Sequence, residues 1–137
     1  MVIYVIRHGE TDWNTKHWLQ GTTDIPLNRN GIEVAEITSE ALKGIPFDVI
    51  FSSPLKRAYQ TAEIMKRERQ IPLIVDERLK EISFGCFEGL CCTGPNYNIP
   101  DPDFPNFFQN PAHYNPPEGG ESIAELCVRG TDFLTWL

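Results

Sequence analysis

The chain opens with the stretch VIYVIRHGET, residues 2–11, and this stretch decides the fold class. Its first half, Val2–Ile6, is a short apolar run rich in β-branched residues, which is typical of a strand covered on both faces in a parallel sheet. The polar cluster RHGET, residues 7–11, follows at once. Because functional groups of open α/β folds lie at the carboxyl ends of strands, we expect chemistry at this cluster.

Strands and helices alternate in the sequence that follows. Apolar residues recur at helical spacing over residues 28–42, where Gly44 would end the helix, and again over residues 55–66. The run Phe47–Phe51 indicates a second buried strand, and Leu73–Val75 indicates a third short strand after Pro72. This alternation predicts an α/β chain with three layers, α/β/α, and a mostly parallel central sheet with right-handed crossovers.

Two helix starts are marked, and the region between them is irregular. The triplet Ser52-Ser53-Pro54 offers an N-cap and a first-turn proline for the helix over residues 55–66. A final amphipathic helix is expected from Glu121 or Ser122 to Leu137. Between Gly89 and Gly120 stand seven prolines and several aromatic residues, which predict a long lid-like loop over residues 90–120 with one helical turn at 104–108.

Length, charge and cysteine content narrow the class of protein. The 137 residues predict one domain over 1–137, and the net charge of −7 argues against nucleic acid or an anionic membrane as partner. No apolar run approaches the ~20 residues that span a bilayer, and the start of the chain lacks a signal-peptide pattern, so a cytoplasmic protein is expected. The four cysteines form no CxxC pair, which favours reduced, mostly buried thiols over a zinc site.

Four residues from three separate segments suit the chemistry of a phosphate group. Arg7 offers a planar fork to two phosphate oxygens, and the adjacent His8 imidazole can attack phosphorus in line. Arg57 stands in the first turn of the helix that follows the second strand, where the helix dipole adds to its charge. Glu81 follows the third strand and can exchange a proton with a leaving group and with water. If the three parallel strands are neighbours, their carboxyl ends would bring these residues to the mouth of one site.

Four ordered motifs resemble those of the histidine phosphatase superfamily, which includes the cofactor-dependent phosphoglycerate mutases. The first is RHGET at 7–11 with Trp13-Asn14, Gln20-Gly21, Asp24, Pro26-Leu27 and Gly31 behind it. The others are SSPLKRAYQTA at 52–62, LKEISFGCFEG at 79–89 and PEGGES at 117–122. The resemblance implies the phosphoglycerate mutase-like fold.

The resemblance also implies a role for each matching residue. His8 would be the nucleophile that becomes phosphohistidine, Arg7 and Arg57 would clamp the phosphoryl group, and Glu81 would be the general acid and base. The residues expected to contact phosphate or substrate are Asn14, Gln20 and Gly21. No metal and no cofactor is implied, because arginines neutralise the charge, and the expected partner is a small phosphorylated molecule.

The sequence departs from the family in one respect. Members carry a second catalytic histidine, followed by glycine, on a later strand beyond the PEGGES-like segment, whereas His17 and His113 match neither feature. The chain therefore covers about the N-terminal two thirds of the family fold. A natural truncation, an engineered or proteolysed fragment, and strands supplied by a partner copy all fit, and truncation is favoured. A homo-oligomer that covers the exposed sheet edge is the partner this predicts.

Within the family, the loop after the third motif distinguishes mutases from phosphatases. Mutases carry a longer insertion after the third motif, and the stretch FFQNPAHY at 107–114 resembles the loop of small bacterial phosphatases such as the α-ribazole phosphatase group. We therefore predict phosphomonoester hydrolysis, impaired if the second histidine is required. Mutase-type phosphoryl transfer and an inactive phosphate-binding remnant are the alternatives.

Overall fold

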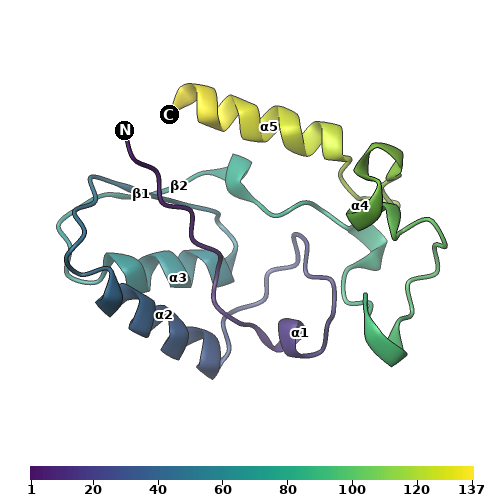
Figure 1. Cartoon of the computed structure of the whole chain (residues 1–137), viewed down its shortest axis with the longest axis horizontal. Coiled ribbons are helices and arrows are strands. Elements are labelled where there is room, and N and C mark those ends of the chain that lie inside the picture. The colour runs from purple at the N-terminus through teal and green to yellow at the C-terminus, as the bar shows by residue number, and fades with distance from the viewer.

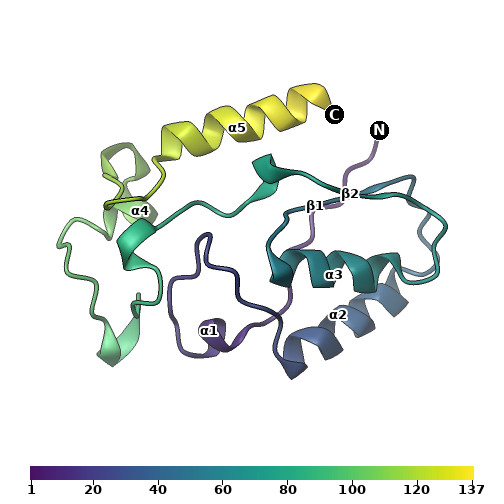
Figure 2. The same cartoon turned by 180° about the vertical axis from the view of Figure 1, so that it is seen from behind.

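The computed structural model describes all residues, 1–137, and places two helical layers around a small sheet (Figures 1 and 2). No helix in it has both the length and the apolar character needed to cross a bilayer. Short 3₁₀ turns lie at Glu77–Leu79, Gly85–Phe87, Gly94–Asn96 and Pro111–His113. The helices and strands are α1 (Asp12–Thr15), α2 (Arg29–Ala41), β1 (Ile50–Ser52), α3 (Lys56–Lys66), β2 (Leu73–Val75), α4 (Asn106–Gln109) and α5 (Ile123–Trp136).

The sheet is parallel, and helices cover both of its faces. β1 pairs with β2 in the register Ile50 to Leu73, and α3 forms the crossover between them. α2 and α3 lie together on one side of the strands, while α5 runs along the other side (Figure 1). The Phe51 ring of β1 stands 5.5 Å from Phe133 and 5.6 Å from Trp136 of α5, centroid to centroid. The expected α/β class and its helical layers are confirmed.

The first predicted strand is the main difference from expectation. Residues 2–6 are assigned to no strand, and none of their backbone groups makes a hydrogen bond within the chain. A strand needs a partner about 4.8 Å away, but a cavity of about 1160 Å³ lies between residues 1–8 and residues 45–53. The apolar run over residues 2–6 is therefore unpaired and largely exposed to solvent, with Val2 78% and Val5 92% exposed.

The helix boundaries follow the predictions closely, with one correction at α3. The Asn28 side chain caps α2, and Ser122 forms a capping box with Glu125 at the start of α5. Neither predicted serine is the N-cap of α3, which is Leu55. Instead Asp24 Oδ1 accepts a hydrogen bond from the Lys56 backbone N–H at 2.7 Å, so the loop before α2 caps this helix.

The region after Gly89 is folded rather than open. Phe104, Tyr114 and Ile99 are buried in one apolar cluster with Phe84 and Phe87. The expected helical turn is present as α4. None of the residues that line the large cavity comes from 90–120, so a lid function for this segment stays a prediction.

The cysteines differ from expectation in their burial. All of them are free thiols, as predicted, but Cys91 alone is buried. Cys92 is half-buried, and Cys86 and Cys127 are exposed. The prediction of mostly buried thiols was wrong, because Cys91 alone is enclosed by the fold.

Candidate active site

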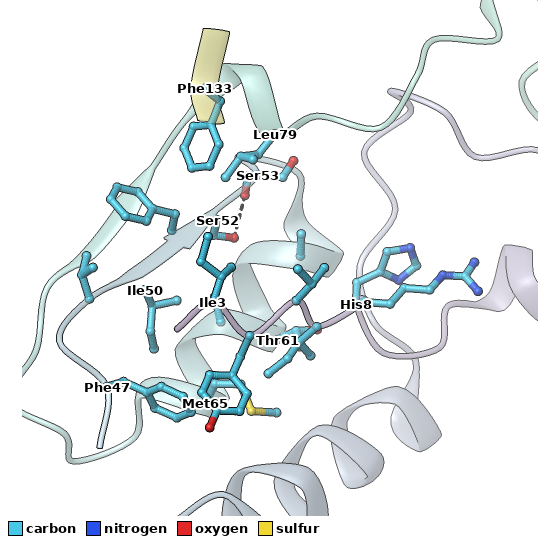
Figure 3. A pocket seen from close by; sticks show the side chains of 18 of the residues that line it. Ile3, His8, Phe47, Ile50, Ser52, Ser53, Thr61, Met65, Leu79 and Phe133 are labelled. Carbon is cyan, nitrogen blue, oxygen red and sulfur yellow. Dashed lines mark hydrogen bonds between the residues drawn. The ribbon is translucent and has the colours of Figure 1, made fainter. Parts of the chain in front are cut away.

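The large cavity gathers the residues predicted to carry the chemistry. Arg7, His8, Arg57 and Glu81 all line it. Figure 3 shows His8 at one end of this cavity, apart from apolar side chains such as Ile50 and Phe133. The cavity is thus apolar over most of its length and charged at one end.

Close backbone packing holds His8 at the charged end. A Cβ atom on Gly9 would lie 2.5 Å from the Gly31 carbonyl oxygen, so glycine is required where this segment crosses the start of α2. The Gly9 N–H donates to Thr61 Oγ1 at 3.1 Å, and Thr61 in turn donates to the Arg57 carbonyl at 2.7 Å. The backbone after His8 is therefore tied directly to α3.

The protonation state of His8 suits a nucleophile. Its Nδ1 lies 2.7 Å from the Gly9 carbonyl oxygen, which can only accept, so Nδ1 carries the proton and Nε2 keeps its lone pair. Burial lowers the pKa of His8, and the charges of Arg57 and Arg7 lower it further, against the raising effects of the Gly9 hydrogen bond and Glu81. The neutral imidazole is thus the favoured form near neutral pH.

Arg57 is a buried cation with a fixed orientation. The residue is 1% exposed, and its guanidinium donates to the Thr23 carbonyl at 2.9 Å and to the Gly21 carbonyl at 2.6 Å. Burial lowers the pKa of Arg57, although Glu81, Asp24 and Glu88 counter that effect, and an arginine stays charged in this range. Arg57 also lines the cavity that contains His8, and the remaining N–H groups of its guanidinium make no hydrogen bond within the chain.

Asn14, Gln20 and Gly21 do not line this cavity, although they lie in the adjoining segment. Thr11 Oγ1 lies 2.9 Å from both Asn14 Oδ1 and Gln20 Oε1 and donates its single proton to one of them, and Asn14 also closes the capping box of α1. Gly21 offers its carbonyl to Arg57. The predicted contacts of these residues with phosphate stay predictions, and their observed bonds organise the loop.

Glu81 is exposed at the cavity rim. Its Oε1 accepts a hydrogen bond from its own neighbour, the Ile82 N–H, at 2.9 Å. The segment before it is held by Arg129 of α5, which donates to the carbonyls of Arg78 and Lys80 at 2.6 and 2.7 Å. Sequence reasoning did not single out Arg129, because a charge inside an amphipathic helix gives no signal of a contact with a distant loop.

Two further observations complete the site. His17 and His113 lie outside the cavity, which leaves His8 as its histidine. The chain holds no group of three His, Cys, Asp or Glu residues arranged to bind a metal ion. Arg7, Arg57 and Lys80 are the cationic side chains that line the cavity, and Lys80 is paired with Glu77 at 2.6 Å.

Comparison with known proteins identifies a family. The model of the histidine phosphatase superfamily (branch 1) matches residues 3–137. The chain is 41% identical over 104 residues to the uncharacterized phosphatase PhoE of Bacillus subtilis, a match that covers 76% of this chain and 54% of that protein. It is 33% identical over 132 residues to phosphoserine phosphatase 1 of Hydrogenobacter thermophilus, covering 96% of this chain and 62% of the relative. Other relatives are named phosphoglycerate mutases.

Solved structures agree with these relatives. The structure of Bacillus stearothermophilus YhfR superimposes with a TM-score of 0.84 at 36% identity, over 94% of this chain and 63% of that one. The chain thus spans between about half and two thirds of the length of the proteins that it matches.

Proposed function

The chain belongs to the histidine phosphatase superfamily (branch 1), and from that membership we propose that it hydrolyses phosphomonoesters through a phosphohistidine on His8. One observation carries the proposal above all others. The His8 imidazole is held with its Nδ1 proton on the Gly9 carbonyl and its Nε2 free, at the end of the cavity where the arginines gather. That arrangement suits in-line attack on phosphorus.

The proposed reaction has two steps. In the first, His8 Nε2 forms a bond to phosphorus as the bond to the ester oxygen breaks, and Glu81 gives its proton to the leaving alkoxide. In the second, Glu81 takes a proton from water, whose oxygen displaces the imidazole and releases inorganic phosphate. Arg7 and Arg57 neutralise the charge on the equatorial oxygens in both steps.

Mutase-type transfer and an inactive phosphate-binding remnant are the competing functions. In a mutase, the phosphohistidine returns its phosphoryl group to an organic acceptor instead of water, and the relatives named phosphoglycerate mutases support this alternative. Hydrolysis is favoured because no residue of 90–120 lines the cavity to exclude water from the phosphohistidine. We further propose a cytoplasmic location, which the free cysteines support.

We expect the chain to release inorganic phosphate from an aryl phosphate at mildly acidic to neutral pH. It should not interconvert 3- and 2-phosphoglycerate faster than it hydrolyses them, even with 2,3-bisphosphoglycerate present. Phosphate release measured by a colorimetric assay and isomer exchange followed by NMR separate the two reactions. Isomer exchange that outpaces phosphate release would establish the mutase, and binding of phosphate without either reaction would establish the remnant.

We propose that two copies of the chain associate through the open side of the sheet. The unpaired edge of β1, the unpaired backbone of residues 2–6 and the apolar cavity between them lie together. An edge of this kind pairs readily with another strand. Residues 2–6 of a second copy are apolar, β-branched and likewise unpaired, so they provide a self-complementary partner across a two-fold axis.

Sedimentation velocity tests the association. We expect a dimer at micromolar concentration that Val5→Lys shifts toward monomer, because Val5 is 92% exposed in this open segment. Val128→Lys is the matched control, because Val128 is 70% exposed on α5 outside the cavity and should leave the dimer intact. A well-folded monomer over the whole concentration range would refute the proposal.

A further inference from the structure

Glu88 stands at the centre of a dense hydrogen-bond cluster that the reaction scheme does not use. Its carboxylate accepts hydrogen bonds from the backbone N–H groups of Thr22, Thr23 and Phe84 at 2.9, 2.8 and 3.1 Å. The hydroxyls of Thr22 and Thr23 donate to it as well. Burial alone would raise the pKa of Glu88, but the hydrogen bonds from Thr23, Thr22 and Phe84 lower it overall, so the carboxylate is charged.

The loop that Glu88 holds is the same loop that orients Arg57. The peptide unit between Gly21 and Thr22 contributes both groups: its N–H points to Glu88 and its C=O accepts from Arg57. A peptide unit is planar, and in the trans form its N–H and C=O point in opposite directions. The position of the N–H on the carboxylate therefore fixes the direction of the carbonyl. Thr23 also bonds both groups, with its N–H on Glu88 and its C=O on Arg57, but these belong to two successive peptide units, so only the Gly21–Thr22 unit forms a direct link.

The backbone at Gly21 needs to be held in place, and we call the hydrogen bonds from Thr22 and Thr23 to Glu88 the clamp. Gly21 has a φ of +52°, a region that glycine enters and leaves at little cost, so the following peptide unit is easily rotated. A Cβ atom at Gly21 would lie 2.1 Å from Glu88 Oε1, so the carboxylate is packed directly against this glycine. The turn has one backbone hydrogen bond across it, from the Thr23 N–H to the Gln20 carbonyl at 3.0 Å, whereas the Thr22 N–H of the Gly21–Thr22 peptide unit bonds only Glu88.

We propose that Glu88 is a positioning residue, which acts through the Gly21–Thr22 peptide unit, and less directly through Thr23, to hold the Arg57 guanidinium at the charged end of the cavity that His8 also lines. Its catalytic importance rests on the proposed function, but its effect on Arg57 does not. Loss of the clamp lets the two carbonyls turn away, and the guanidinium follows them away from His8. The site then loses part of its positive charge at the point where a phosphoryl group would bind.

The pKa of His8, followed by NMR titration, reports the position of Arg57 without any need for turnover. In Glu88→Gln we expect it to rise by about half a pH unit, because the Arg57 charge that lowers it moves away. Removal of the Glu88 charge by itself acts in the opposite direction, since a lost carboxylate destabilises an imidazolium. An unchanged or lowered pKa would therefore overturn the proposal.

Two further variants separate positioning from charge. Thr23→Val keeps the Glu88 charge but removes one hydroxyl donor, and we expect a smaller rise in the pKa of His8; no rise there would overturn the role of the loop. Glu10→Gln is the control: it removes a carboxylate that bonds Asn28 and Asn30 but not the loop, and it should leave the pKa of His8 level or lower.

Binding of inorganic phosphate, followed through the same NMR signals, provides a double-mutant cycle. Glu88→Gln alone should weaken binding by about tenfold, as expected for a misplaced charge-assisted donor. In an Arg57→Ala background it should weaken binding no further, because its effect passes through Arg57. Full additivity of the two losses would show that Glu88 has only a general structural role.

Discussion

Arg57→Ala is expected to lower kcat/KM for an aryl phosphate by about 10³-fold, because the proposed reaction uses this buried arginine as a charge-assisted donor to the reacting phosphate. Saturation with inorganic phosphate should shift to much higher concentration in the same variant. The reason is geometric: Arg57 is 1% exposed and oriented by two carbonyls, and we expect the exposed Arg7 and the Glu77-paired Lys80 not to replace it. Arg7, the other arginine of the cavity, is exposed and has no hydrogen-bond partner that orients it.

The same substitution should also destabilise the fold. The Gly21 carbonyl loses its donor, while the Thr23 carbonyl keeps the Ile25 N–H, so we expect a loss of about 1–3 kcal/mol in free energy of unfolding. Urea unfolding of the wild type and Arg57→Ala measures that loss. Activity must therefore be compared at low temperature and low denaturant, where the variant is folded.

Arg69→Ala provides the matched control for Arg57→Ala. Arg69 also donates to two backbone carbonyls, those of Leu42 and Ile45, at 2.7 and 2.8 Å, but it does not line the cavity. Its removal should lower stability without a loss of phosphate affinity. If Arg69→Ala and Arg57→Ala weaken phosphate binding equally, Arg57 has no special role in the site.

The charged end of the cavity was predictable from the sequence because polar residues follow each apolar run. His8 follows residues 2–6, Arg57 lies one turn after β1, and Glu81 follows β2. The carboxyl ends of parallel segments meet at one edge, so these side chains were expected at one mouth, and they line one cavity. The helices were predictable for a similar local reason, since apolar spacing and caps such as Asn28 act within a few residues.

The contacts that were missed join residues far apart in the chain. Glu88 bonds Thr22 and Thr23 across more than sixty residues, and Asp24 caps α3 from more than thirty residues away. No periodic pattern records such pairs, because the fold alone brings the two segments together. The prediction of a strand over residues 2–6 was wrong for a related reason. The composition of this run favours a strand, but a strand also needs a hydrogen-bonded neighbour, and composition does not show where that neighbour lies.

His8→Ala is expected to abolish turnover, with a loss of about 10⁴-fold or more, because the variant has no nucleophile and the remaining groups only bind the substrate. Rapid acid-free quenching with a labelled aryl phosphate should trap a phosphoryl group on the wild type and none on His8→Ala. The bond is expected to be labile in acid and stable in base, which separates phosphohistidine from a phosphoserine. His17→Ala and His113→Ala, which change histidines outside the cavity, should retain the label.

The acid limb of the pH profile gives a second, independent test of the same nucleophile. Attack needs the neutral imidazole, so kcat/KM should fall as pH decreases through the pKa of His8. Burial, aided by the charges of Arg57 and Arg7, lowers that pKa below its ordinary value, so activity should persist at pH values where an ordinary histidine is already protonated. A phosphoenzyme that survives in His8→Ala, or an acid limb above the ordinary range for histidine, would assign the nucleophile to another group. In either case the arginines would still mark a phosphate site, but the reaction would have to begin from a residue other than His8.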